Sequence, residues 1–230
     1  MAATGSTNDD VAALARAGEA EGFWLRAETQ TGGRGRHGRN WQSPVGNLFT
    51  STIIRRQTGE PPAASLAMVA ALALHQVAVA YGGGGRVRLK WPNDVLLDGA
   101  KLSGILLEAV DDAVVIGFGV NLAHRPENLD RETASFAHAG LGAPDPAAFL
   151  SDLADALAYW LGRWRGEGLG VILREWRARA HAVGTPLRTT GADGHQIEGL
   201  FEGLDDDGAL KLRLADGTIH ILHAGDVFLI

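Results

Sequence analysis

The chain has 230 residues, enough for one large domain or for a main domain with a small appendage. Hydrophobic residues make up 46% and charged residues 21%, as in ordinary globular proteins, and the formal net charge of -6 disfavours a general binder of nucleic acid or membrane surfaces. The sequence contains no cysteine, which excludes disulfides, thiolate metal sites and cysteine nucleophiles. We expect no signal peptide and no segment long enough to span a bilayer, and therefore a cytoplasmic protein.

The first half of the chain predicts an α+β arrangement. Ser6 and Thr7 precede apolar residues at helical spacing, which is typical of a capped helix. Turn residues at 98–99 and 111–112 separate short apolar runs and predict an antiparallel meander. The predicted elements are a helix from about residue 8 to 18, strands over 23–29 and 47–55, a buried helix over 62–81, and strands over 87–90, 95–97, 102–109 and 114–120.

The second half of the chain predicts two helices, followed by a region of short strands. Apolar residues recur at helical period from Pro146, a further helix is predicted over 169–181, and both are expected to pack on the sheet. Beyond Gly184 short alternating strands are separated by turns at Asp193-Gly194, Asp207-Gly208 and Asp216-Gly217. We therefore predict a main domain over residues 1–183 and a small SH3-like β-barrel over residues 184–230.

The connection over residues 30–46, called the Gly/Arg loop below, is the first candidate for function. It contains Gln30-Thr31-Gly32-Gly33-Arg34-Gly35-Arg36-His37-Gly38-Arg39. Glycines allow backbone N–H groups to approach an anion, and guanidinium groups suit carboxylate and phosphate, so the loop could clamp a ligand. The composition is equally typical of a mobile solvated loop or of a nucleic-acid patch. It is not a Walker loop, because no Gly-Lys-Ser/Thr ends it.

A second candidate is Lys90-Trp91-Pro92-Asn93-Asp94, which lies between two predicted strands. It places a cation, an amide and a carboxylate within one turn. Pro, Asn and Asp are also the usual residues of turns, so for this segment taken alone a turn without function is the favoured explanation.

Two strands carry the remaining candidates. Lys101 begins an apolar strand that contains Gly104, and it either protects a sheet edge or points into a cleft where it neutralises negative charge. Gly117 and Gly119 leave bare backbone on one face of the next strand, either for a thin ligand or for a bend. The scattered histidines give no zinc spacing, so no zinc site is expected.

Taken together and in this order, the segments resemble the biotin protein ligase family. Its catalytic domain is recognised by a Ser-Thr-Asn start, a Gly-Arg-Gly-Arg-x-Gly loop, a Lys-Trp-Pro-Asn-Asp turn, a Lys-Leu-x-Gly-Ile strand and a Gly-x-Gly-x-Asn strand, all present between Ser6 and Asn121. The resemblance implies a mixed, largely antiparallel sheet covered by helices, similar to class II aminoacyl-tRNA synthetases, followed by the small barrel. It also implies an ATP-dependent ligase that forms biotinyl-5'-AMP and transfers biotin to a lysine of a biotin carboxyl carrier protein.

The resemblance implies roles for particular residues, stated here as expectations. Hydroxyl and amide groups would satisfy the ureido group of biotin, while basic residues would meet its carboxylate and the ATP phosphates. The expected biotin-binding residues are Ser6, Thr7, Asn8, Gln30, Gly33, Arg34, Arg36, Lys101, Gly104, Gly117 and Gly119. The expected ATP-binding residues are Arg36, Arg39, Trp41, Lys90, Asn93, Lys101 and Asn121, and the expected catalytic residues are Lys101, Arg36 and Asp94.

The implied cofactors are ATP and Mg²⁺, with the magnesium carried by ATP and its protein ligands unknown. The implied partner is a carrier protein, without nucleic acid or membrane, and a homodimer is possible. Because the Ser-Thr-Asn motif lies within ten residues of Met1, we expect no helix-turn-helix domain and no repressor function. Two rivals remain. A lipoate or octanoate ligase would activate a different acid in the same way, and an RNA-binding module would use the Gly/Arg loop without ATP turnover.

Overall fold

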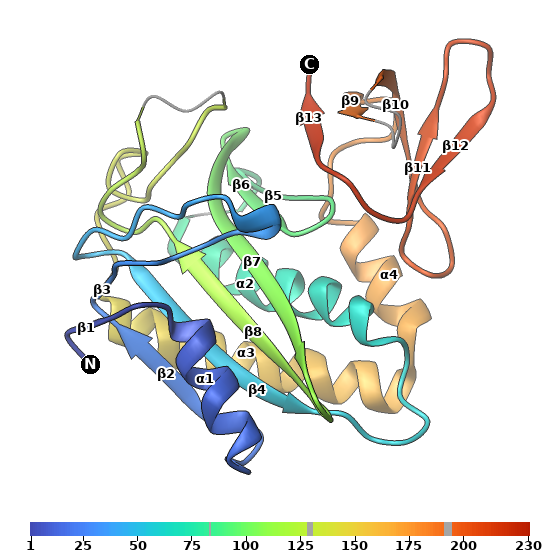
Figure 1. Ribbon diagram of the computed structural model, residues 1–230. Coiled ribbons are helices and arrows are strands. Elements are labelled where there is room, and N and C mark those ends of the chain that lie inside the picture. The colour runs from blue at the N-terminus through green and yellow to red at the C-terminus, as the bar shows by residue number, and fades with distance from the viewer. Residues whose placement is uncertain (83, 128–130, 191–194) are drawn as a thin grey trace.

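The computed structural model describes residues 1–82, 84–127, 131–190 and 195–230. Within these residues a six-stranded antiparallel sheet forms the centre of the main body (Figure 1). Its strands lie in the order β2 (Trp24–Ala27), β4 (Leu48–Arg55), β8 (Ala113–Val120), β7 (Ala100–Val110), β6 (Asp94–Leu97) and β5 (Val87–Lys90). The predicted meander is confirmed, and Asp98 and Gly99 form its first tight turn with φ of 51° and 84°, as an Asp-Gly hairpin turn requires.

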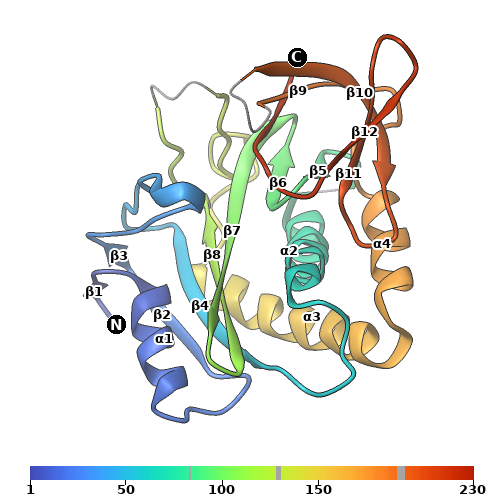
Figure 2. The same cartoon turned by 45° about the vertical axis from the view of Figure 1, so that its right-hand side comes forward.

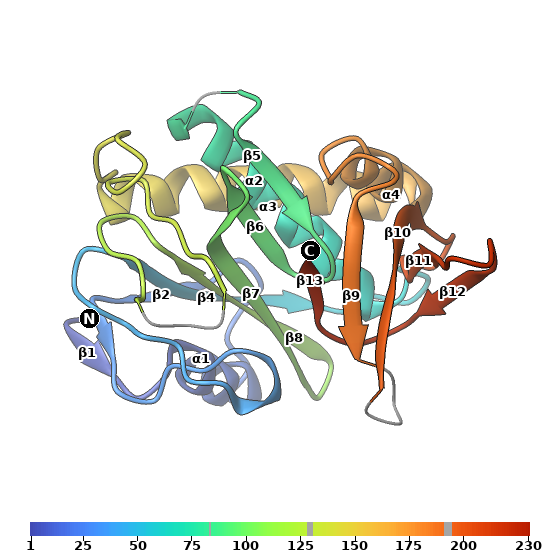
Figure 3. The same ribbon diagram turned by 90° about the horizontal axis from the view of Figure 1, so that it is seen from above.

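Helices cover both faces of this sheet. Helix α1 (Thr7–Arg16) buries Val11 and Ala15 against β4 and β8 on one face. On the other face lie α2 (Leu66–Gly82) and α3 (Pro146–Glu167), so the sheet runs between α1 and the α2–α3 layer (Figure 3). The resulting α+β architecture is the one predicted.

Helix α2 corrects the expectation that no segment is long enough to span a bilayer. The segment Ala63–Gly82 has 20 residues and a mean hydropathy of 1.8, which is sufficient by length and composition. In the fold, however, 67% of its apolar window is buried, against α3, α4 and strands of the sheet. The helix is apolar nearly all round because protein surrounds it, as the sequence pattern predicts for a core helix.

Helix α4 differs from its prediction in length and in position. It covers Leu169–Arg177 instead of 169–181, and it packs chiefly on α2, α3 and the second sheet rather than on the six-stranded sheet (Figure 2). The residues that follow run beside β5, where the Leu89 N–H donates to the carbonyl of Arg179 at 2.9 Å. This edge pairing ends the helix early.

A second antiparallel sheet of five strands occupies the described part of the C-terminal region. Its order is β12 (Ile219–Leu222), β11 (Leu210–Arg213), β10 (Gln196–Leu204), β9 (Pro186–Thr190) and β13 (Val227–Leu229). Because β13 returns to pair with the first strand, β9, the unit has the small SH3-like form that was predicted. The predicted turn at Asp193-Gly194 lies outside the described residues. The division between residues 183 and 184 stays a prediction.

Candidate active site

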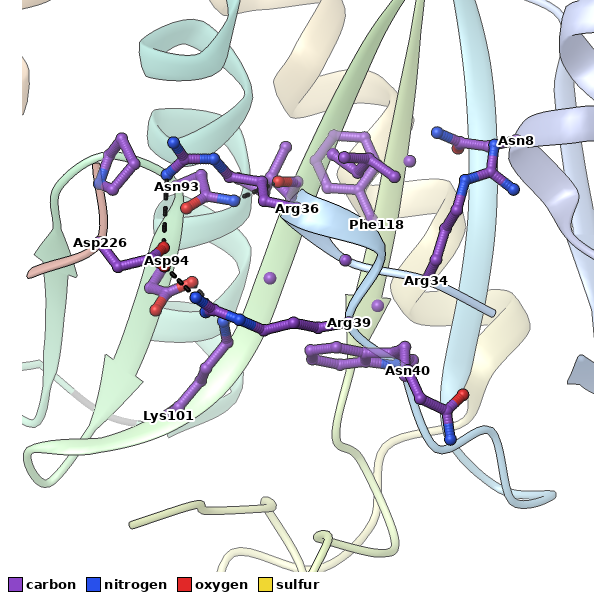
Figure 4. A pocket seen from close by; sticks show the side chains of 18 of the residues that line it. Asn8, Arg34, Arg36, Arg39, Asn40, Asn93, Asp94, Lys101, Phe118 and Asp226 are labelled. Atoms are coloured by element: carbon purple, nitrogen blue, oxygen red, sulfur yellow. Dashed lines mark hydrogen bonds and ion pairs between the residues drawn. The ribbon is translucent and has the colours of Figure 1, made fainter. Parts of the chain in front are cut away.

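A pocket lies between the six-stranded sheet, the Gly/Arg loop and strand β13 (Figure 4). It gathers residues that are far apart in the sequence. Among the candidates named from the sequence, its lining contains Ser6, Thr7, Asn8, Gln30, Arg34, Arg36, Arg39, Trp41, Lys90, Asn93, Asp94, Lys101, Gly104, Gly117 and Gly119. The separate motifs therefore meet in one cavity, and Arg36 and Lys101 share it.

Two predicted site residues, Gly33 and Asn121, are not among the lining residues. The carbonyl of Gly33 accepts the N–H of Trp41 at 2.9 Å, and a Cβ on Gly33 would come within 2.9 Å of the Gln30 amide nitrogen. Asn121 is buried and donates from Nδ2 to the carbonyl of Ala134 at 3.0 Å. Both residues thus support the pocket from behind instead of facing into it.

The N-terminal motif reaches the pocket through a short parallel pairing. Strand β1 (Ala3–Thr4) lies beside β3 (Thr29–Gln30), which brings the start of α1 against Gln30. Gln30 Oε1 accepts the Thr7 N–H at 2.8 Å and the Thr7 hydroxyl at 3.1 Å. Ser6 stands at the N-cap position but makes no capping hydrogen bond, which corrects the predicted cap. Gln30 thus accepts the first N–H of the helix, and the buried Ser6 side chain lines the pocket.

Behind Thr7 lies a buried polar network that sequence reasoning missed. The Ser51 hydroxyl is placed to donate to Thr7 Oγ1 at 2.8 Å or to Asn8 Oδ1 at 2.6 Å, and Asn8 Nδ2 donates to Glu108 at 2.6 Å. A Cβ on Gly117 would lie 2.1 Å from Asn8 Oδ1, so the bare backbone of Gly117 admits Asn8. A signal was present in the sequence, since β4 carries three adjacent polar residues, Thr50, Ser51 and Thr52, in a strand that is otherwise apolar up to Arg55.

Arg34 is fully engaged with acidic side chains. Its two terminal nitrogens each lie 2.7 Å from a carboxylate oxygen of Asp9, and Nη2 also lies 2.9 Å from Glu108. The hydrogen bonds from Arg34 hold the pKa of the Asp9 carboxyl below its usual value. Arg34 thus ties α1, the Gly/Arg loop and β7 together at the rim of the pocket.

The indole of Trp41 lies flat against the strand glycines. A Cβ on Gly119 would come within 2.5 Å of this ring and one on Gly104 within 3.2 Å, so both glycines are needed for the close approach. The ammonium of Lys101 lies 5.6 Å from the centre of the ring. Within the described residues the buried indole nitrogen of Trp41 has no hydrogen-bond acceptor.

The cationic end of the pocket centres on a buried ion pair. Lys101 Nζ contacts the carboxylate of Asp94, and Lys90 Nζ lies 3.4 Å from the same group. Burial opposes ionisation of Asp94, but the charges of Lys101 and Lys90 outweigh it and lower the pKa of this carboxyl. Burial also lowers the pKa of Lys101, and Asp94 offsets this only in part. The Lys101 ammonium therefore lies in a site of low exposure, where its electrostatic interaction with a nearby negative charge is stronger than in water.

Several lining residues were not predicted from the sequence. They are Gly35, Asn40, Pro92, Ile105, Leu106, Phe118, Arg131, Asp226, Val227 and Phe228. The last three come from the C-terminal segment, where Asp226 lies 187 positions beyond its partner Arg39, so no local motif could reveal them. Asp226 binds Arg39, and Arg36 donates to the Gly225 carbonyl at 3.0 Å.

The donor set suits anionic organic ligands better than a protein-held metal. Among the described residues there is no group of three or more His, Asp or Glu side chains that could hold a metal ion. The carboxylates lining the pocket, those of Asp94 and Asp226, are each paired with two basic side chains. Hydroxyl and amide groups gather at one end and cations at the other, which can hold a neutral polar head beside acid and phosphate groups.

The chain is similar to known proteins along its whole length. The family model described as "Biotin/lipoate A/B protein ligase family" matches residues 6–121, and "Biotin protein ligase C terminal domain" matches residues 188–230. The chain is 41% identical to the biotin--[acetyl-CoA-carboxylase] ligase of Paracoccus denitrificans, covering 99% of this chain and 98% of the relative. It is 36% identical to the enzyme of the same name from Mycobacterium tuberculosis, covering 99% and 86%.

A solved structure supports the fold. The biotin protein ligase from Aquifex aeolicus in complex with biotin and ATP superposes with a TM-score of 0.87, covering 100% of this chain and 97% of that one. The two sequences are 22% identical, so the likeness is one of architecture.

Proposed function

The chain belongs to the biotin/lipoate A/B protein ligase family, and on that premise we propose that it is an ATP-dependent biotin protein ligase. It activates biotin as biotinyl-5'-AMP and transfers biotin to a lysine of a carrier protein. The observation that carries the proposal is the single pocket, in which the N-terminal hydroxyls, the Gly/Arg loop, Lys101 and the strand glycines converge. The ligase named from Paracoccus denitrificans, matched over nearly its whole length, favours biotin over lipoate.

The polar end of the pocket receives the ureido group of biotin. Ser6, Thr7 and Gln30 supply hydroxyl and amide partners, and Asn8, Arg34 and the network behind them hold these groups in place. A urea buried without partners would lose its hydrogen bonds to water, so such a site selects against acids that lack one. Gly104, Gly117 and Gly119 keep this part of the sheet bare, and Gly33 supports the loop.

In the first half-reaction a biotin carboxylate oxygen attacks the α-phosphorus of ATP. An O–P bond forms, the bond to the β-phosphate oxygen breaks, and pyrophosphate leaves. Two anions must approach each other, and the cations of Arg36 and Lys101 offset their repulsion and stabilise the charge that builds on the phosphate oxygens. Further nucleotide contacts are assigned to Arg39, Trp41, Lys90 and Asn93. Asn121, which was expected among them, supports the pocket from behind its lining.

In the second half-reaction the neutral amine of the acceptor lysine attacks the carbonyl carbon of the adenylate. An amide C–N bond forms, the bond from the carbonyl carbon to the phosphate oxygen breaks, AMP leaves, and the nitrogen gives up a proton to water. The resemblance implies a catalytic role for Asp94, which at this step would be to orient or deprotonate the amine. Its carboxylate is instead bound by Lys101 and Lys90, and its lowered pKa makes it a weak base. We therefore assign to Asp94 the positioning of Lys101 at the reacting phosphate.

Magnesium fits this site when it is coordinated by the phosphates of ATP. The carboxylates of Asp94 and Asp226 are already neutralised by basic side chains, so phosphate oxygens are the more suitable ligands for Mg²⁺. When bound, the ion neutralises the departing pyrophosphate. We further propose a cytoplasmic enzyme that acts on a biotin carboxyl carrier protein without nucleic acid or membrane, with the domain division at 183/184. A homodimer is compatible with this proposal.

A transfer assay tests the substrate. The purified chain is incubated with ATP, Mg²⁺ and a biotin carboxyl carrier protein, with labelled biotin in one series and labelled lipoate in the other. We expect label on the carrier lysine only from biotin. Preferential lipoate transfer would overturn the assignment of the acid, and absence of transfer and of ATP turnover would overturn the enzyme class.

A further inference from the structure

The C-terminal strand reaches over to the Gly/Arg loop. Asp226, Val227 and Phe228 line the same pocket as the motifs of the main body, although the five-stranded sheet carries none of those motifs. In Figure 4 the carboxylate of Asp226 lies between the guanidinium groups of Arg36 and Arg39. A residue of the small sheet thus touches the two arginines that the proposed function assigns to the phosphates.

Both arginines contact the same short segment, Gly225 and Asp226. Arg39 binds the Asp226 carboxylate, and the terminal nitrogen of Arg36 lies 3.0 Å from the Gly225 carbonyl and 3.9 Å from the Asp226 carboxylate. The segment itself is anchored, because the Thr189 hydroxyl on β9 donates to the Asp226 carbonyl at 2.8 Å. Gly225 has a φ of 144°, a conformation open chiefly to glycine, and its carbonyl accepts from Arg36.

We infer that Asp226 is a positioning residue for nucleotide binding, which holds Arg39, and Arg36 with it, over the pocket so that their remaining N–H groups face the phosphates. This inference rests on the proposed function. A guanidinium carries five N–H donors in a rigid plane, so anchoring one edge leaves the other edge oriented for a second anion. The gain lies in preorganisation, because an arginine already held in place loses less conformational entropy when the phosphate arrives.

A surface ion pair without a role would contribute little, since exposed pairs are worth at most about 1 kcal/mol and are screened by salt. The arrangement here differs in two respects. Arg39 is 47% exposed, but the side chains of Asp226 and Arg36 are only 26% and 23% exposed, and both arginines of one loop converge on one anchored segment. A carboxylate that only competed with phosphate for these arginines would weaken ATP binding, and its removal would then strengthen it. The positioning role predicts the opposite sign.

The experiment compares Asp226→Ala, Asp226→Asn and Asp226→Glu with Glu198→Gln. Glu198 is the matched control, because it lies in the same sheet, pairs with Arg188 at 2.9 Å and does not line the pocket. Wild-type adenylation in the same assay checks the proposed function separately. For Asp226→Ala and Asp226→Asn we expect the KM for ATP to rise about tenfold, the effect of losing a charge-assisted hydrogen bond, with the KM for biotin and the melting temperature nearly unchanged. Asp226→Glu should recover part of the loss.

Two further measurements isolate the mechanism. In a double-mutant cycle, adding Asp226→Ala to Arg39→Ala should change the KM for ATP by less than twofold, because Asp226 acts through Arg39. Hydrogen exchange of the ligand-free protein should become faster in the Gly/Arg loop of Asp226→Ala but not of Glu198→Gln, a readout that needs no activity. A KM for ATP that stays the same or falls, additive effects in the cycle, or unchanged loop exchange would each overturn the inference.

Discussion

The ammonium of Lys101 contacts the carboxylate of Asp94 in the wall of the pocket, where the two side chains are only 10% and 7% exposed. The topology brings them together, because β6 and β7 form an antiparallel hairpin in which Lys101 pairs with Leu96, only two positions along β6 from Asp94. A lysine held in this way is fixed in position and kept charged by its partner. Removal of Lys101, loss of its proton and substitution of residues around it should therefore each change the activity or stability of the protein.

Removal of the lysine should affect activation more than transfer. Lys101→Ala should lower pyrophosphate release from biotin and ATP on the order of 100-fold, because a cation is lost where charge develops on the phosphate. Transfer from added biotinyl-5'-AMP should fall much less. Lys211→Ala, on β11 and outside the pocket lining, is the control for loss of a lysine. An unchanged rate of pyrophosphate release would show that Lys101 has another role.

The pH dependence follows from the directions of the pKa shifts. Burial lowers the pKa of Lys101 from 10.5, so adenylation should be lost on the alkaline side at a lower pH than for a free lysine. Asp94 raises the pKa of Lys101, and Asp94→Asn removes that support. The alkaline limb of the rate profile for Asp94→Asn should therefore move to lower pH. A shift in the other direction, or none, would contradict the coupling of these two groups.

Arg36 should retain the intermediate. With Arg36→Ala the Gly/Arg loop loses both an anionic ligand contact and its bond to the Gly225 carbonyl. We expect biotinyl-5'-AMP to leave the enzyme before transfer and to label bystander lysines. Mass spectrometry of the filtrate and of the protein fraction measures the share of the adenylate formed that is free, and this share should increase roughly tenfold relative to wild type if a contact of this kind is lost. Tight retention of the adenylate by this variant would count against the role of the loop.

A methyl group on Gly119 should displace Trp41. The added Cβ would lie 2.5 Å from the indole, so Gly119→Ala should cost about 1 to 3 kcal/mol in the free energy of unfolding and raise the KM for substrate. Gly162→Ala is the matched control, because Gly162 lies at an exposed position of α3 with nothing within 4 Å of the new methyl group. That change should stabilise the protein by up to about 1 kcal/mol. Urea unfolding and steady-state kinetics compare the two variants. A Gly119→Ala variant with unchanged stability and KM would mean that the Trp41 ring does not need a glycine at this position.

Arg165 should matter for stability alone. It donates to both oxygens of Glu21 at 2.6 and 2.8 Å and to Glu60 at 2.6 Å, outside the residues that line the pocket. Arg165→Ala should lower the free energy of unfolding by about 2 kcal/mol, since two partly buried carboxylates each lose one of their partners, although Glu60 keeps Arg56 and Glu21 keeps the Arg55 N–H. The adenylation rate per folded molecule should stay the same. A drop in that rate without unfolding would reveal a coupling between this cluster and the pocket.

Sequence reasoning was most successful where a pattern is local. The hairpin at Asp98-Gly99 and the apolar run of α2 each depend on neighbouring residues, and the ordered motifs identified most of the pocket lining. It was least successful where partners are distant. The partnership of Asp226 with Arg39, the network behind Thr7 and the placement of α4 depend on tertiary packing, which no single segment encodes. Asp94 is a related case, because its ion pair with Lys101 was not expected from the sequence.

The most direct test of the central claim is a single incubation of the purified protein with biotin, ATP and Mg²⁺ in the absence of acceptor, followed by mass spectrometry. The account predicts a biotinyl-5'-AMP signal and an equal amount of pyrophosphate from wild-type protein, with both strongly reduced in Lys101→Ala. Folded wild-type protein that yields neither product, or a Lys101→Ala variant that yields both at the wild-type rate, would contradict it.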